Sequence, residues 1–238
     1  MLQEKAMTDF DLYYWPVPFR GQLIRGILAS AGKTWTEHDS DEIGQLMASS
    51  PAEQSTPFMG PPVLVDNASG FALSEMPAIA CYLGEKLDLV PPSIEGRART
   101  LKVVNDANDV LDEITLNGGR QMWTEETWRD FVPRLRRWME IWEATGIRCG
   151  LRHEEGTLLG TATPGVADIV SAVLWSTMTE RFPAIEALLR DAAPNVAALV
   201  RRMTEMPRLK RLAEQARDEY GSSYCGGEIE QSLRKVAV

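Results

Sequence analysis

The sequence predicts an α+β protein in which a βαβαββα unit over residues 1–84 precedes an all-helical bundle domain over residues 97–238. Two observations give this fold class: strand-like patterns occur only before residue 84, and helical periodicity dominates after residue 97. A third observation is the segment DLVPPSIEG, whose prolines and glycine interrupt any regular element. We therefore expect a linker over residues 85–96.

The elements of the first domain follow from the apolar pattern. FDLYYW at the start of the chain predicts a strand that Pro16 ends, and RGQLIRGILASAG predicts a helix that ends at Gly32. TWTEHD predicts a second strand and DEIGQLMAS a second helix. PVLVD and FALS, joined by the turn DNASG, predict a β-hairpin, and EMPAIACYLGEKL predicts a third helix.

The second domain is expected to contain only helices and a tail. Apolar residues recur at helical spacing over the segments 97–123, 125–147, 165–180, 183–190 and 193–218. The tail, residues 221–238, contains Cys225 followed by two glycines and a mixture of charges. We expect it to be either a mobile lid or disordered.

Composition narrows the class of protein. The 238 residues carry a net charge of −9, and residues 1–84 hold four Lys and Arg against ten Asp and Glu, so a nucleic-acid partner is not expected. No apolar run approaches the roughly 20 residues of a membrane helix. The N-terminus MLQEKAMTDF does not resemble a signal peptide, so we expect a cytoplasmic protein.

Cysteine and histidine patterns point to no metal and no disulfide framework. Cys81, Cys149 and Cys225 are an odd number without ligand spacing, and we expect reduced thiols. His38 and His153 each stand alone in the sequence, so we expect neither to bind a metal.

Five motifs occur in an order that resembles a known family. They are YWPVPFRGQLIRGIL from Tyr14, PPVLVD from Pro61, AIACYL from Ala78, VVNDANDVL from Val103 and GVADI from Gly165. From about residue 10 to residue 215 the chain resembles the cytosolic glutathione transferase superfamily, most closely its tyrosine-using mu and pi classes. The resemblance implies a thioredoxin-like first domain, glutathione as co-substrate, and a homodimer.

Tyr14 is the candidate catalytic residue. Glutathione chemistry requires a thiolate, and a thiol has a pKa of about 8.5 unless a donor or a helix N-terminus stabilises its ionised form. Tyr14 follows the first strand, faces the first helix and resembles the family's catalytic tyrosine. Tyr13 is the alternative, because a shift of one residue exchanges the two faces of a strand. A packing role for Tyr14 also remains open.

The resemblance also implies a glutathione-binding set in this chain: Arg20, Pro61, Pro62, Glu75 and Met76. In the family, the bond before the second proline is cis and the adjacent backbone pairs with the cysteinyl unit. Pro61 has no N–H to donate to it. Met76 replaces the usual serine and offers no hydroxyl, and Gly60 replaces a side-chain amide of the pi class. Arg25 is expected to tie the first helix to its neighbours.

Further site residues come from the resemblance. Asp106 or Asp109 would lend an acid to the glutathione amine of the neighbouring subunit, although both are equally expected as solvated helix charges. The second-substrate pocket would be lined by Trp15, Val17, Phe19, Leu116 and Arg120, largely apolar as a hydrophobic electrophile requires. The same side chains are compatible with ordinary core packing.

The residues support one leading function and two alternatives. The leading hypothesis is a glutathione S-transferase that conjugates the glutathione thiolate to a hydrophobic electrophile. The altered binding residues also fit a non-catalytic binding or carrier protein of the same fold. The third hypothesis is a glutathione-dependent lyase, isomerase or peroxidase.

Overall fold

A four-stranded mixed sheet forms the first domain. The computed structural model describes residues 8–238, apart from the side chain of Asn117, so residues 1–7 of the expected first domain lie outside the described residues. The strands are β1 (Phe10–Tyr13), β2 (Trp35–His38), β3 (Val63–Asp66) and β4 (Phe71–Ser74), in the order β2-β1-β3-β4. β2 pairs parallel to β1, whereas β3 pairs antiparallel to both β1 and β4.

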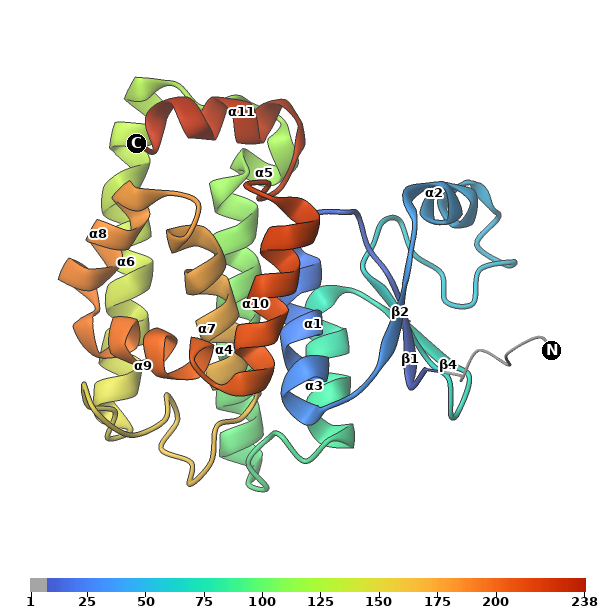
Figure 1. Ribbon diagram of the computed structural model, residues 1–238, viewed down its shortest axis with the longest axis horizontal. Coiled ribbons are helices and arrows are strands. Elements are labelled where there is room, and N and C mark those ends of the chain that lie inside the picture. The colour runs from blue at the N-terminus through green and yellow to red at the C-terminus, as the bar shows by residue number, and fades with distance from the viewer. Residues whose placement is uncertain (1–7) are drawn as a thin grey trace.

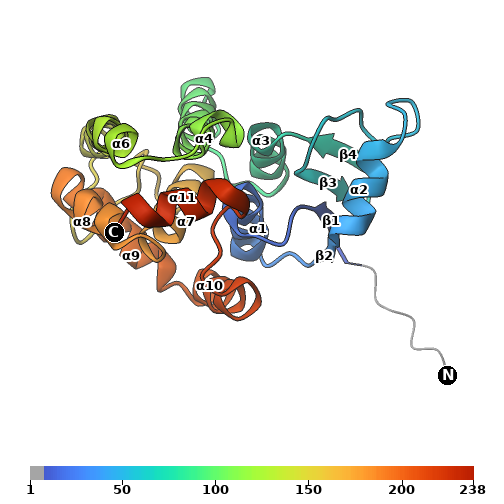
Figure 2. The same cartoon turned by 90° about the horizontal axis from the view of Figure 1, so that it is seen from above.

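Three helices complete this domain: α1 (Phe19–Ala31), α2 (Ser40–Ala48) and α3 (Met76–Lys86). The order βαβαββα is the predicted one. α2 lies on one side of the sheet, and α1 and α3 lie on the other, toward the helical domain (Figure 2). Alternate residues of β1 are buried, as a strand with one face on the core requires.

The second domain contains only helices among the described elements. They are α4 (Ile94–Ile114), α5 (Leu116–Gly119), α6 (Glu125–Arg148), α7 (Val166–Thr179), α8 (Pro183–Ala192), α9 (Pro194–Thr204), α10 (Pro207–Tyr220) and α11 (Gly227–Val236). Figure 1 shows α7 enclosed by the other helices. Nearly all of its residues are buried, including Trp175, which stacks edge-on against Trp142 of α6. The α+β fold class is therefore confirmed.

The structure divides two of the expected helical segments and places a helix in the tail. The segment 193–218 is two helices, because Pro207 starts α10 and the residue before a proline disfavours helical geometry. The segment 97–123 is divided after α4, where Leu116 has a φ of 48°. The tail 221–238 contains α11, whose buried Leu233 packs in the core, so the expected disorder is wrong and movement as a lid stays a prediction.

The two domains meet along α1, which packs against both α3 and α7. Arg25 of α1 is 3% exposed, and its guanidinium donates to the carboxylate of Glu37 on β2 at 2.7 and 3.0 Å. It also donates to the Val17 carbonyl at 3.2 Å. Arg25 thus ties α1 to the sheet edge and to the loop that precedes the helix, the role expected of it.

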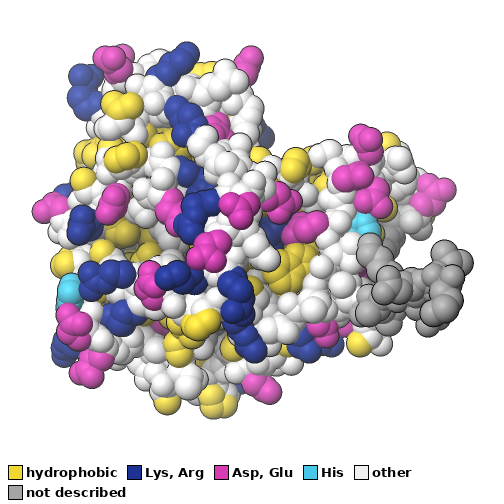
Figure 3. Space-filling model, in the orientation of Figure 1, with side chains coloured by type: hydrophobic (Ala, Val, Ile, Leu, Met, Phe, Trp, Pro, Cys, Tyr) yellow, Lys and Arg dark blue, Asp and Glu magenta, His cyan; other side chains and the backbone are white. Residues whose placement is uncertain are grey.

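Charges of both signs are mixed over the face seen in Figure 3, where basic and acidic side chains alternate along the helices. The net charge of −9 therefore does not form a single acidic field on that face. Within residues 8–238, no helix is both long and apolar enough to cross a membrane.

Candidate active site

Tyr14 lies directly after β1, and its hydroxyl accepts a hydrogen bond from the backbone N–H of Arg20 at 3.0 Å. This N–H belongs to the first turn of α1, where backbone donors have no partner within the helix. Pro18 occupies the N-cap position and supplies no side-chain acceptor. The tyrosine hydroxyl therefore takes the place of a capping side chain at the positive end of the helix.

Tyr14 remains protonated at neutral pH. Burial raises its pKa to about 12, partly opposed by the positive charge of Arg20 and the hydrogen bond from its backbone. Within the described residues the hydroxyl accepts one hydrogen bond and donates none. Its proton is thus available to a ligand atom, and a thiolate there would also lie near the N-terminus of α1.

Gly21 allows the Tyr14 ring to approach the backbone of α1 closely. A Cβ on Gly21 would lie only 2.7 Å from Cγ of Tyr14, closer than side-chain carbons approach one another. The ring therefore packs directly against the backbone of α1 at Gly21. Sequence reasoning missed this contact, although a glycine in the first turn of a helix is a signal for close approach.

Tyr13 occupies the opposite face of β1. Its ring stacks on His38 with the centroids 3.9 Å apart. The imidazole of His38 also lies 3.3 Å from Asp11 and 3.2 Å from Glu42. His38 thus has carboxylate neighbours that its isolation in the sequence did not indicate. Of the two tyrosines, only Tyr14 has its hydroxyl at the N-terminus of α1.

Arg20 links α1 to α4. Its Nε donates to Asn108 at 3.1 Å, and its Nη2 lies 3.7 Å from Asp112. The side chain retains 24% exposure. Arg20 therefore lies beside Tyr14 with part of its guanidinium open to solvent, and its role toward an anionic ligand stays a prediction. Asn108 is a neighbour that sequence reasoning missed.

The Pro61–Pro62 bond, immediately before β3, is cis, as the sequence predicted. Its place beside β1 follows from the pairing of Val63 with Tyr13. A side chain at Gly60 would meet nothing within 4 Å, so the missing amide leaves open space.

The N-terminus of α3 has an unusual backbone. Glu75, at the N-cap, has a φ of 73° and a ψ of 118°, a region that non-glycine residues rarely occupy. Its side chain is exposed. Met76 is 1% exposed, so its side chain belongs to the core and only its backbone faces the helix end. Strained backbone of this kind is concentrated at ligand-binding sites.

Asp106 and Asp109 lie on α4. Asp106 pairs with Lys102, and burial raises the pKa of its carboxyl group. The pKa of Asp109 is also raised by burial, together with the charges of Glu113 and Asp112. Both acids are part of a charged helix face, and their role toward a neighbouring subunit stays a prediction.

The expected second-substrate residues meet the C-terminal segment. Phe19, whose backbone N–H donates to the Tyr224 carbonyl at 3.3 Å, packs edge-on against the fully buried Tyr224 ring. Val17 lies beside Gly226. Trp15 retains 36% exposure, Leu116 is partly buried and Arg120 is exposed. The C-terminal segment thus contacts two of the five expected residues, Val17 and Phe19.

Glu230 holds the tail in place. One carboxylate oxygen accepts from the backbone N–H groups of Tyr224, Cys225 and Gly226 at 2.9, 2.9 and 2.6 Å. The other oxygen accepts from the guanidinium of Arg234 at 2.9 and 2.6 Å. Burial and the nearby charge of Glu230 raise the pKa of the Cys225 thiol to about 12. Sequence reasoning missed Glu230, since only the fold brings these N–H groups to it.

No cluster of three or more His, Cys, Asp or Glu side chains suited to a metal ion occurs in the part of the chain that the structure describes. The titratable groups at the end of α1 are Tyr14, Arg20, Tyr224 and Cys225. The guanidinium of Arg25 also lies over the Tyr14 ring, with its central carbon 5.7 Å from the ring centroid.

Comparisons with known proteins bear on the fold of the chain. A family model described as the glutathione S-transferase C-terminal domain matches residues 99–236. No curated protein matches the sequence.

Several solved structures share the fold over nearly the whole chain. A Nu-class glutathione transferase from Haemonchus contortus is 23% identical, with a TM-score of 0.69 over 88% of this chain and 98% of that one. Monomeric Na-GST-3 from Necator americanus is 20% identical, with a TM-score of 0.69 and coverage of 87% and 96%. Ure2p in complex with glutathione is 13% identical, with a TM-score of 0.70 and coverage of 90% and 96%. At these identities the likeness shows the fold, a thioredoxin-like domain followed by a helical one.

The contact between Gly21 and Tyr14 predicts opposite effects for two glycine substitutions. Gly21→Ala places a methyl group inside the Tyr14 ring, and such overpacking destabilises a protein by about 1–3 kcal/mol. Gly44→Ala, in the open middle of α2, should stabilise it by about 0.5–1 kcal/mol. Urea denaturation measures both. Equal effects of the two substitutions would contradict the close packing of Tyr14.

The contacts of Glu230 predict that Glu230→Ala releases the segment around Cys225. A hydrogen bond to a charged group contributes about 1.5–3 kcal/mol, so losing several should speed modification of Cys225 by a thiol reagent at least about tenfold. Glu228→Ala, at an exposed position of the same helix, is the control and should leave the rate unchanged. An unchanged rate in Glu230→Ala would show that the segment is held by other contacts.

Proposed function

Because the chain belongs to the glutathione S-transferase family, whose C-terminal domain model matches more than half of it, we propose that it is a tyrosine-type glutathione transferase. The observation that carries this proposal is the Tyr14 hydroxyl at the N-terminus of α1, protonated at neutral pH and without an acceptor for its proton in the described residues. The tyrosine and the order of the motifs favour the mu and pi classes.

The proposed chemistry begins with the glutathione thiol. Tyr14 donates its hydroxyl proton in a hydrogen bond to the sulfur, and the positive end of α1 adds to the stabilisation of the thiolate. Arg20 contributes a positive charge nearby. The thiol proton leaves to solvent. The sulfur then attacks an electrophilic carbon, a carbon–sulfur bond forms, and the displaced electron pair goes to a leaving group or to an adjacent atom that is protonated.

The rest of glutathione is held by groups around β3 and α3. We assign the carbonyl of Pro61, beside cis-Pro62, to the cysteinyl unit. Glu75 and the backbone N–H of Met76 are assigned to the γ-glutamyl end. The positive φ of Glu75 supports this assignment, since it sets the backbone at the start of α3 apart from ordinary helix geometry. Asp106 or Asp109 from the partner subunit is proposed to meet the amine.

The second substrate is proposed to be a hydrophobic electrophile. Trp15, Val17 and Phe19 form one wall, and Leu116 and Arg120 another. The C-terminal segment at Tyr224 and Gly226 packs on this site, so it is a third wall and limits the size of the substrate. A lyase, isomerase or peroxidase would use the same thiolate with a different electrophile.

One observation favours a second candidate function, a glutathione-binding or carrier protein without transferase activity. Pro61 lacks a backbone donor and Met76 buries its side chain in the core, so two groups that would hold glutathione in the resembled classes are missing. Weaker positioning of glutathione lowers the rate of conjugation more readily than it abolishes glutathione binding.

Glutathione titration followed by Tyr14→Phe tests the proposal. Glutathione at 100 times its dissociation constant should stabilise the protein by about 2.7 kcal/mol, seen as a higher melting temperature. Removing one hydrogen bond to the thiolate costs about 1.5–3 kcal/mol, which raises the pKa of the bound thiol by about 1–2 units. The thiolate absorbance measured against pH gives this pKa, and conjugation should fall more at pH 6.5 than at pH 8.5.

Tyr13→Phe is the matched control, because Tyr13 packs on His38 on the other face of β1. It should leave the thiol pKa unchanged. If Tyr13→Phe changes the pKa of the bound thiol and Tyr14→Phe does not, then Tyr13 is the residue that stabilises the thiolate. Binding of glutathione without conjugation of any electrophile would favour the carrier function, and no binding would exclude both.

We further propose a cytoplasmic homodimer. The three cysteines are unpaired, as a reducing compartment favours. Met59, in the loop before Pro61, is 93% exposed, and Leu101 on α4 is 46% exposed. Such apolar side chains favour burial against a second copy. Sedimentation equilibrium should give twice the 26.5 kDa of the chain. If the protein is a monomer at all concentrations, neither Asp106 nor Asp109 can contact the glutathione amine in a partner subunit.

A further inference from the structure

The guanidinium of Arg25 lies over two tyrosine rings. Its central carbon is 5.7 Å from the centroid of the Tyr14 ring and 5.3 Å from the centroid of Tyr220, the last residue of α10. A cation within about 6 Å of a ring centroid is attracted by the π electrons of the ring. Burial raises the pKa of Tyr220 to about 12, as it does that of Tyr14, so both rings are neutral at neutral pH. Arg25 thus places a positive charge against the ring of the proposed catalytic tyrosine.

Hydrogen bonds from three segments hold the guanidinium of Arg25 in this position. The carboxylate of Glu37 on β2 accepts from it at 2.7 and 3.0 Å, the Val17 carbonyl at 3.2 Å and the Gln22 side chain at 3.5 Å. Burial disfavours the charge, but the hydrogen bonds and the charge of Glu37 outweigh burial and raise the pKa of the Arg25 guanidinium. Arg25 therefore stays charged inside the protein.

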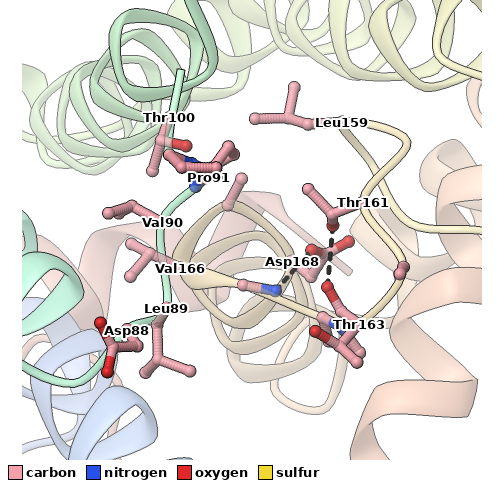
Figure 4. Close-up of a pocket in the computed structure, with 15 residues that line it drawn as sticks. Asp88, Leu89, Val90, Pro91, Thr100, Leu159, Thr161, Thr163, Val166 and Asp168 are labelled. Carbon is pink, nitrogen blue, oxygen red and sulfur yellow. Dashed lines mark hydrogen bonds between the residues drawn. The ribbon is translucent and has the colours of Figure 1, made fainter. Parts of the chain in front are cut away.

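Asp168 shows a different use of a buried charge. This carboxylate, beside the pocket between the linker and α7 (Figure 4), is 1% exposed. It accepts from the backbone N–H groups of Leu158 and Gly165 at 2.7 and 2.9 Å and so caps α7. Hydrogen bonds of this kind account for a folding role. The bonds of Arg25 to Glu37 have the same role, but they do not account for its contact with the Tyr14 ring.

Arg25 acts on the thiol site without touching a ligand there. It is 3% exposed, whereas the side chain of Arg20 keeps 24% exposure. A nearby cation stabilises an ionised phenol more than a neutral one, so it lowers the pKa of the hydroxyl. The charges of Arg20 and Arg25 oppose the rise that burial causes in the pKa of Tyr14. The other titratable neighbour, Tyr224, is neutral, because burial raises its pKa well above the usual value.

We propose that Arg25 is a positioning residue for the thiol site. Its charge over the Tyr14 ring strengthens the Tyr14 hydroxyl as the hydrogen-bond donor to the glutathione sulfur, because a more acidic hydroxyl is a stronger donor. Its bond to the Val17 carbonyl holds the loop that joins Tyr14 to α1. The step that involves glutathione rests on the proposed function, whereas the action of Arg25 on the Tyr14 hydroxyl does not.

Difluorotyrosine at position 14 tests the action of Arg25 on the ring in the absence of glutathione. This analogue ionises at a lower pH than tyrosine, and its fluorine resonances report the ionised fraction in the folded protein. Arg25→Gln should raise the midpoint of the titration by about 1 unit, since an opposite charge at this distance lowers a pKa by about 1–3 units and Glu37 offsets part of that effect. Glu37→Gln removes the negative charge and leaves the cation, so it should lower the midpoint.

The two variants separate the charge of Arg25 from its structural role. Both break the bond between Arg25 and Glu37, so a purely structural role predicts the same change in both. Arg208→Gln is the control, because Arg208 donates to the Ser30 carbonyl at the C-terminal end of α1, and it should leave the midpoint unchanged. An unchanged midpoint in Arg25→Gln, or equal shifts in the two variants, would overturn the proposal. If Arg25→Gln does not fold, the direction of the shift in Glu37→Gln decides.

A double-mutant cycle tests the step that involves glutathione. Arg25→Gln should raise the pKa of the bound thiol, read from the thiolate absorbance, and this increase should be lost in protein that carries Tyr14→Phe. If Tyr14→Phe raises the thiol pKa and Arg25→Gln does not, the role of Arg25 is overturned and that of Tyr14 stands. If glutathione does not bind, the proposed function fails, and the fluorine titration still decides whether Arg25 acts on Tyr14.

Discussion

The uncapped N-terminus of α1 is the constraint on which the rest of the structure depends. Pro18 offers no side-chain acceptor, so the first N–H groups of the helix need partners from elsewhere. The backbone N–H of Arg20 donates to the hydroxyl of Tyr14, and the backbone N–H of Phe19 donates to the carbonyl of Tyr224. A buried N–H without a partner costs about 1–3 kcal/mol, so both contacts are needed. The end of β1 and the C-terminal segment are thereby fixed at one point.

The same helix joins the two domains, because it packs against both α3 and α7. The positive end of α1 faces the proposed thiol site with the exposed part of Arg20 beside it, which suits an anionic sulfur. Asn108 of α4 and Tyr224 of the C-terminal segment, both from the helical domain, bond to the first residues of this helix.

The start of α3 shows why single substitutions are hard to interpret from sequence. Met76 was expected at the glutathione end of the site, and its replacement of a serine was expected to weaken binding there. In the fold its side chain fills the core, while the preceding Glu75 carries the unusual backbone conformation. The position of a residue in a motif gave its place along the chain. The direction of its side chain depended on packing between α3 and the sheet.

The sequence by itself determined the fold class and the order of the first seven elements, because apolar periodicity and the turn residues are local properties of the chain. The resemblance also indicated the cis bond at Pro62 and a position for Tyr14 facing the first helix. Only the tertiary structure decided that Gly21 contacts the Tyr14 ring, that Glu230 accepts hydrogen bonds from three N–H groups, and that residues 221–238 contain a helix packed on the core. These contacts join residues distant in sequence or depend on side-chain direction, and neither is encoded in a local pattern.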